Sequence, residues 1–158
     1  MGTATTLASE KPQTLPAILW GGWWAGVLDI TAAFIRWGKP VRLLQGIASG
    51  LLGPQAFQGG SGTAALGLAL HFFIAFSAAG VYYAASRKLA FLRKQAVAWG
   101  MLYGVAVYMF MSWVVVPLSA LPKSKAPFSL TGLVLSLLTH MFCVGLPIAL
   151  AVRRHAIR

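Results

Sequence analysis

The chain has 158 residues, of which 58% are hydrophobic and only 9% are charged, and its mean hydropathy is +0.75. Soluble domains have about 25% charged residues, so this composition excludes an ordinary soluble domain and indicates a membrane protein. Thirteen Lys and Arg against two acids give a net charge of +11, but the cations lie in short groups between apolar runs. That distribution indicates contact with the lipid bilayer and its anionic headgroups, and it argues against nucleic-acid binding.

Residues 1–14 are polar, and we expect them to form a cytoplasmic N-terminal tail. They lack the basic start of a signal peptide, so the first apolar run is expected to remain as a span. Residues 153–158 form a basic C-terminal tail.

Four apolar segments reach the length of about 20 residues that a helix needs to cross a hydrocarbon core. Backbone groups in lipid must be satisfied within the segment, so we predict an all-α integral membrane four-helix bundle forming one domain over 15–152. The expected spans are 15–35, 64–85, 96–116 and 130–152. Aromatic side chains near their ends, typical of the membrane interface, are Trp20, Trp23, Trp37, Tyr82, Tyr83, Trp99 and Trp113.

The segment 41–57 lies between the first two spans and is too short to cross the membrane. Leu43, Leu44, Ile47 and Leu51 recur at helical spacing, so we predict a short amphipathic helix. One interpretation places it in the interface; the other makes it re-entrant. In the re-entrant form Gln45, Ser49 and Gln55 would line a cavity.

We expect Pro54 to end this short helix and residues 59–62 to form a flexible joint before the second span. Between the third and fourth spans, Pro117, Pro122 and Pro127 are expected to mark a stiff external loop.

Asp29 is the acidic residue inside a predicted span. A carboxylate there costs roughly 2.5–3.5 kcal/mol on insertion scales, which makes it a candidate functional residue. Each span carries its polar residues on a face of small residues, which lets membrane helices approach closely. The glycines expected to pack helices are Gly22, Gly26, Gly67, Gly100, Gly104 and Gly132. Cys143 is interpreted as a small packing residue.

Asp29, His71, Tyr108 and His140 lie at a similar depth, roughly 9–15 Å from the same end of the predicted bundle at 1.5 Å per helical residue. We therefore predict a polar intramembrane cluster of Asp29, His71 and His140, with Tyr108 and Ser112 nearby.

Several chemistries fit this cluster, and the sequence leaves them open. An Asp–His pair suits proton transfer near neutral pH. Asp29, His71 and His140 could instead hold a metal ion, and two histidines from separate helices could ligate a haem. The polar groups could also fasten helices in a structural or accessory subunit, or bind a small ligand. No catalytic residue is assigned, because phosphate-binding loops, zinc-protease motifs and paired carboxylates are absent from the sequence.

A faint internal repeat relates the spans in pairs. LGLALHFF around His71 aligns with LSLLTHMF around His140, and Gly22-x-x-x-Gly26 aligns with Gly100-x-x-x-Gly104. The alignment predicts a duplicated helix pair and puts Val107 where the first copy has Asp29, so the site would be asymmetric.

The stretches LLGPQAFQGG, LALHFFIAF, VVVPLSALP and HMFCVGLPIALAVRR resemble a family of small bacterial inner-membrane proteins, from about Trp20 to Arg154. The resemblance implies four helices and a multi-pass protein of the bacterial inner membrane, without an assigned activity or catalytic residues. With both termini in the cytoplasm, eight Lys and Arg lie inside and five outside, in the sense of the positive-inside rule. The glycine-rich faces would also allow a homo-oligomer or a membrane complex.

Overall fold

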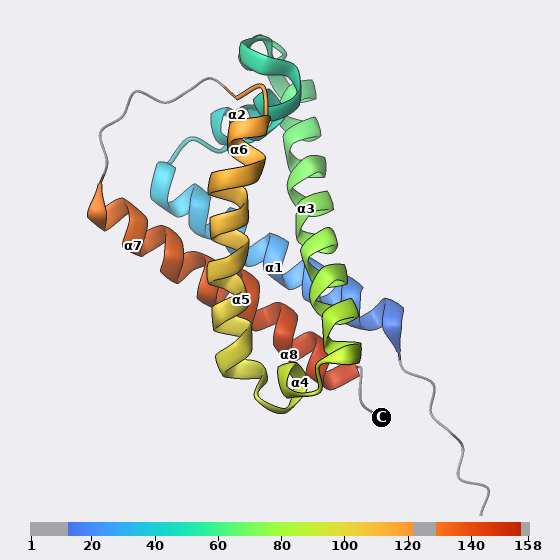
Figure 1. Cartoon of the computed structure of the whole chain (residues 1–158). Coiled ribbons are helices and arrows are strands. Elements are labelled where there is room, and N and C mark those ends of the chain that lie inside the picture. The colour runs from blue at the N-terminus through green and yellow to red at the C-terminus, as the bar shows by residue number, and fades with distance from the viewer. Residues whose placement is uncertain (1–12, 122–128, 156–158) are drawn as a thin grey trace, which may run out of the picture.

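The computed structural model describes residues 13–121 and 129–155. Its helices α1 (Thr14–Trp37) and α3 (Gly60–Lys88) are the first two spans. The third span consists of α5 (Ala96–Phe110), η2 (Met111–Val115) and α6 (Val116–Leu118), and the fourth of α7 (Leu130–Thr139), η3 (His140–Gly145) and α8 (Leu146–His155). All four are long and apolar enough to cross a membrane, which confirms the predicted all-α fold. α1 and the fourth span lie side by side and cross α3 and α5 (Figure 1).

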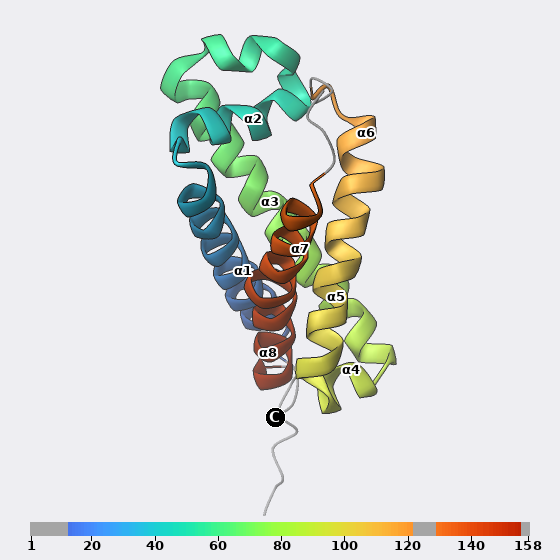
Figure 2. The ribbon, with the colours of Figure 1, turned by 90° about the vertical axis from the view of Figure 1, so that its left-hand side faces the viewer.

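The predicted short helix forms α2 (Pro40–Leu52), which continues into the 3-10 turn η1 (Gly53–Gln58) and lies across one end of the bundle (Figure 2). Gly38 ends α1 with a φ of 62°, and Pro40 opens α2, where its missing N–H costs nothing. The expected end of the helix at Pro54 agrees with the structure to within two residues: α2 ends at Leu52, and Gly53, with a φ of 68°, breaks the helical path just before the proline.

The polar residues that the re-entrant interpretation placed on a cavity, Gln45, Ser49 and Gln55, do not line either of the two cavities around Asp29. Gln45 donates to the Gly60 carbonyl oxygen at 3.0 Å and Ser49 to the Gly46 carbonyl oxygen at 2.7 Å, while Gln55 is exposed. These polar groups are satisfied by the backbone, so it is the apolar Leu43 and Ile47 that face the interior of the bundle.

The joint expected over residues 59–62 is helical from Gly60 onward. The Thr63 hydroxyl donates to the Ala56 carbonyl oxygen at 2.6 Å, and this bond ties the first turn of α3 to η1. Three of the four residues in that segment therefore belong to the spanning helix, which is longer than predicted at this end.

The packed core lies toward the end of the bundle where α1 begins and α8 ends. The short helix α4 (Phe91–Lys94) lies at the same end. Tyr82, Ile148 and Val152 are fully buried there. Tyr82 and Tyr83 are therefore core residues and not the interfacial aromatics we predicted. Their hydroxyls find internal partners, since Tyr82 donates to the Leu92 carbonyl oxygen at 2.9 Å and Tyr83 shares a 2.7 Å hydrogen bond with Thr14.

Five of the six predicted packing glycines allow close approach. Gly22 and Gly26 receive Phe76 and Phe72 from α3, and Gly67 receives the Leu44 backbone of α2. Gly100 and Gly104 lie against the backbone of η3 and α8, including the His140 carbonyl. Gly132 differs: an added Cβ would meet Ser129 of its own first turn at 3.3 Å and the Arg36 guanidinium at 3.4 Å, not the backbone of another span.

The third and fourth spans each contain a wide π-helical turn, η2 and η3. Pro117 and Pro147 lie two residues after the last residue of these turns. A proline inside a helix removes one backbone donor and clashes with the carbonyl one turn earlier. The wide turns relieve that conflict. Pro117 is thus part of the third span and not of the external loop we expected; Pro122 and Pro127 lie outside the described residues.

Candidate intramembrane polar site

A cavity of about 300 Å³ lies between the crossing helices, on the α2 side of the packed core. Asp29 from α1, His71 from α3 and His140 from η3 all line it. The remaining wall is apolar, and it includes Leu43 and Ile47 of α2. The three side chains predicted to form the cluster therefore meet at one cavity.

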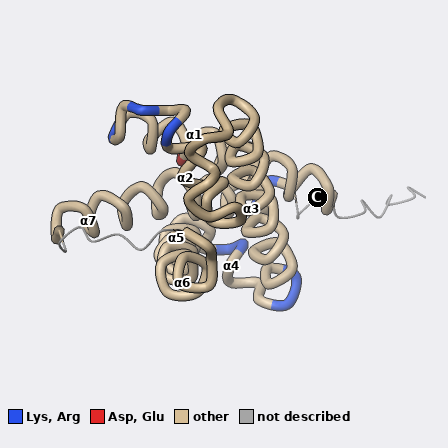
Figure 3. The backbone as a smooth tube through the Cα atoms, turned by 90° about the horizontal axis from the view of Figure 1, so that it is seen from above, with Lys and Arg blue, Asp and Glu red and all other residues tan. Residues whose placement is uncertain are grey.

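Asp29 is the single acidic residue in the part of the chain that the structure describes, and it lies among the helices near the start of α2 (red in Figure 3). It is partly buried on α1, one turn beyond Gly26. The basic residues lie toward the ends of the helices (blue in Figure 3).

His71 joins α3 to α1. Its Nε2 lies 2.9 Å from the Gly26 carbonyl oxygen, and because a carbonyl only accepts, Nε2 carries the proton. Phe72 packs edge-on to the ring at a centroid distance of 5.6 Å and fills the space beside Gly26. The bond holds the ring about one helical turn of α1 from Asp29 and leaves Nδ1 outside this hydrogen bond.

His140 begins the wide turn η3, and its Nδ1 donates to the Ser136 carbonyl oxygen at 2.9 Å in its own helix. Nε2 is therefore the nitrogen of His140 left for other partners. Tyr108 of α5 packs edge-on against this imidazole at a centroid distance of 5.3 Å, which holds the ring in place.

Tyr108 and Ser112 were expected near the cluster. Tyr108 packs against the His140 ring but does not line the cavity, and Ser112 does not line it either. At this level of α5 and η2 the cavity wall consists of Val107 and Met111.

A smaller cavity of about 150 Å³ shares Asp29, Ala33 and His140 with the first and extends to Arg36 and Trp37, which are exposed. Arg36 donates to the Ser136 hydroxyl at 3.1 Å and to the Gly132 carbonyl oxygen at 3.2 Å, and these bonds bridge α1 to α7. Asp29 therefore lies between the inner cavity and a polar edge of the bundle.

The inner cavity has an approximate two-fold relation that follows the internal repeat. Four pairs of its lining residues are equivalent in the repeat alignment: Asp29 and Val107, Ala33 and Met111, His71 and His140, and Ala75 and Val144. Helix contacts correspond as well, because Gly26 meets Phe72 in the first pair and Gly104 meets Met141 in the second. The two helix pairs thus build one cavity, with an acid on one wall only.

Metal binding needs several ligands within reach of one point. Across residues 13–121 and 129–155, no group of three or more His, Cys, Asp and Glu side chains is close enough to hold a metal ion. Asp29, His71 and His140 line the same cavity, but in the described part of the chain their side chains are too far apart to coordinate one metal ion together.

Sequence reasoning missed the residues around the acid and the imidazoles. Arg36 was not singled out, although it lies seven residues from Asp29 and so on nearly the same helix face. Met111 is an apolar residue in an apolar segment, and no sequence signal separates it from lipid-facing neighbours.

These features define the class: a polytopic α-helical membrane protein with a polar cavity inside its bundle. Comparison of the chain with protein-family models, curated proteins and solved structures gives no match.

Proposed function

We propose that this chain is a multi-pass protein of the bacterial inner membrane that handles protons at the Asp29, His71 and His140 cavity. One observation supports the proposal: an acid and two imidazoles, from three different spans, line the same cavity of about 300 Å³. Ionisable groups inside a membrane are costly and commonly mark proton or ion pathways. Each imidazole keeps one ring nitrogen outside its backbone hydrogen bond, which is the group a proton relay uses.

The smaller cavity supports access from one side. It connects Asp29 to the exposed Arg36 and Trp37, whereas the packed core beyond Val144 and Ile148 closes the opposite end. A proton arriving from the α2 side would thus meet Asp29 first and the imidazoles next.

The test is proton flux into liposomes that contain the purified protein and a trapped pH-sensitive dye. With an inward driving force set by a potassium diffusion potential, we expect the wild type to acidify the lumen faster than protein-free vesicles. Asp29→Asn should reduce the flux to background because the amide cannot carry the proton, and Asp29→Glu should restore part of it.

Ser77→Ala is the matched control, since it removes a polar group of α3 that is bonded to the Phe73 carbonyl and lies outside the cavity. It should keep the wild-type rate. Wild-type flux equal to that of empty vesicles, or full flux in a folded Asp29→Asn variant, would falsify the proposal. If Asp29→Asn does not fold, His71→Gln and His140→Gln measured in the same assay take its place.

A structural role is the second candidate, and specific bonds favour it. His71 joins α3 to α1, and Arg36 joins α1 to α7. Such bonds in membrane bundles average roughly 0.6 kcal/mol. For an accessory subunit of this kind, His71→Ala would lower the stability by about that amount, and the liposome assay would detect no proton flux.

The orientation we propose has both termini in the cytoplasm. The ends of α1 and α8 lie on the same side, where Gln13 donates to the His155 carbonyl oxygen at 3.3 Å. Six of the described basic residues, in α3, α4 and α8, lie on that side, against Arg36, Lys39 and Arg42 on the other. The bias agrees in sign with the positive-inside rule.

A further inference from the structure

We propose that the groove between α1 and α8 binds an anionic phospholipid, with the phosphate at Arg154 and His155 and an acyl chain along the apolar remainder. The groove has a volume of about 520 Å³, which is within the range of ligand-binding clefts. It shares no lining residue with the Asp29 cavity, so this inference goes beyond the proposed proton function and does not depend on it.

The groove changes from basic to apolar along its length. Trp20, Trp24 and Leu28 follow one another at four-residue spacing on α1, and Leu150 and Arg154 do so on α8. α1 and α8 are antiparallel, since Gln13 at the start of α1 is hydrogen-bonded to His155 at the end of α8. The cations therefore lie at the membrane-surface end of the groove, and Leu28 lies at the deep end.

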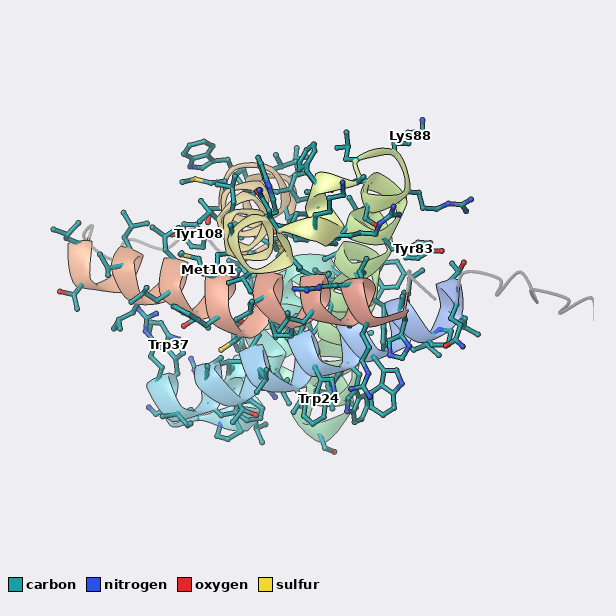
Figure 4. The ribbon with its side chains drawn as sticks, turned by 90° about the horizontal axis from the view of Figure 1, so that it is seen from below. Trp24, Trp37, Tyr83, Lys88, Met101 and Tyr108 are labelled. Carbon is teal, nitrogen blue, oxygen red and sulfur yellow. The ribbon has the colours of Figure 1, made fainter. Side chains whose placement is uncertain are left out.

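The length of the groove is similar to the depth of one leaflet of the bilayer. From Trp20 to Leu28 the groove follows α1 for about 12 Å at 1.5 Å per residue. Half of a hydrocarbon core roughly 30 Å thick is of similar depth. Trp20 and Trp24 are 50% and 49% exposed, and Trp24 extends from α1 at the periphery of the bundle (Figure 4). Indole rings at this level are typical of the headgroup boundary.

Below the groove, α1 packs closely on its neighbouring helices. Gly21 and Ala17 on α1 are buried, and a Cβ added to Gly21 would meet Ile148 Cα at 3.4 Å, Ala151 Cβ at 3.5 Å and Ala79 Cβ of α3 at 3.5 Å. A chain lying in the groove thus rests on a fixed seam between two helices.

The positive charge at one end of the groove favours an anionic lipid headgroup. No acidic side chain lines the groove, and arginine binds phosphate oxygens through two parallel N–H groups. A zwitterionic headgroup brings a second, cationic group to a surface that is already basic, whereas phosphatidylglycerol brings only the negative charge. The structure therefore favours an anionic lipid over phosphatidylcholine.

The experiment is lipid binding to the full chain in neutral detergent, measured by native mass spectrometry with phosphatidylglycerol, phosphatidylcholine and glycerol phosphate. We expect phosphatidylglycerol to bind most tightly. Arg154→Gln should weaken that binding about fivefold, the factor expected for one basic side chain near an anionic headgroup. Arg153→Gln is the matched control, because Arg153 is exposed, adjacent and equally charged but does not line the groove; it should leave the affinity unchanged.

Each other outcome overturns the proposal. Equal losses in Arg153→Gln and Arg154→Gln would mean that general charge attracts the lipid. Equal affinity for the two lipids would remove headgroup selection, and saturation by glycerol phosphate alone would identify a free-phosphate site. Arg154 is exposed and its replacement should fold; if it does not, His155→Gln tests the same end of the groove.

Discussion

Two helical glycines of this protein, Gly104 and Gly80, have very different surroundings. Gly104 lies directly against the carbonyl group of His140, so a methyl group there would meet backbone that cannot rotate away. Gly80, in the middle of α3, has nothing within 4 Å of the same position. The contrast separates a glycine needed for close approach from one that is merely tolerated.

We expect Gly104→Ala to lower the free energy of unfolding by about 1–3 kcal/mol, because overpacking pushes α5 away from η3. Gly80→Ala should be neutral or should stabilise the protein by up to about 1 kcal/mol through helix propensity. Reversible unfolding in mixed micelles measures both. Equal effects of the two substitutions would show that the contact between Gly104 and His140 is not a tight one.

Helix pairs are the repeating unit of this bundle. α1 packs on α3 through Gly22 and Gly26, and α5 packs on η3 and α8 through Gly100 and Gly104. The sequence alignment of the two pairs predicts both sets of contacts, and it pairs His71 with His140 on the cavity wall. The difference between the pairs is chemical: Asp29 in one is Val107 in the other.

The repeat allows the acid to be moved across the cavity. If protons are handled there, Asp29→Val should abolish flux in liposomes, and adding Val107→Asp should recover a measurable part of it, because both positions line the same cavity. Val107→Asp alone tests whether the new acid is tolerated in the fold. A folded double variant without flux would show that the carboxylate must come from α1, against the two-fold relation.

At the scale of the whole molecule, the buried core is concentrated toward one end of the bundle. Buried tyrosines and aliphatic side chains fill the half that holds α4 and the ends of α1 and α8. The α2 half contains the polar cavity and, between α3 and α5, an apolar groove of about 500 Å³. α3 and α5 meet where Tyr103 donates to the Ala78 carbonyl oxygen at 2.8 Å and packs against Tyr82 with the ring planes tilted by 60°.

Topology is tested on intact cells. With Cys143 replaced by Ser, a cysteine at Gln95 beside α4 and one at Ser61 near η1 report opposite ends of the bundle, and both positions are exposed. The proposed orientation predicts that a membrane-impermeant maleimide labels Ser61→Cys from outside and reaches Gln95→Cys only after lysis. The reverse pattern would place the termini outside.

Much of the fold could be predicted from sequence because a membrane imposes simple rules. A run of apolar residues must be helical in lipid, so the predicted spans agree with the four long helices to within a few residues at most ends. The cluster of Asp29, His71 and His140 followed from helical periodicity and depth. Tyr82, Tyr83 and Gly132 were misjudged because helical spacing alone does not say which partner a face meets.

The sequence by itself determined four apolar helices, a short helix between the first two, and a lone acid at the same depth as two histidines, since hydrophobic length and 3.6-residue periodicity are local properties. Only the tertiary structure decided that Arg36 bridges α1 to α7, that Leu43 and Ile47 line the cavity, and that a basic groove runs between α1 and α8. Those features depend on how the helices rotate and cross. That geometry is set by glycine contacts and by the wide turns before Pro117 and Pro147, which act between segments far apart in the chain.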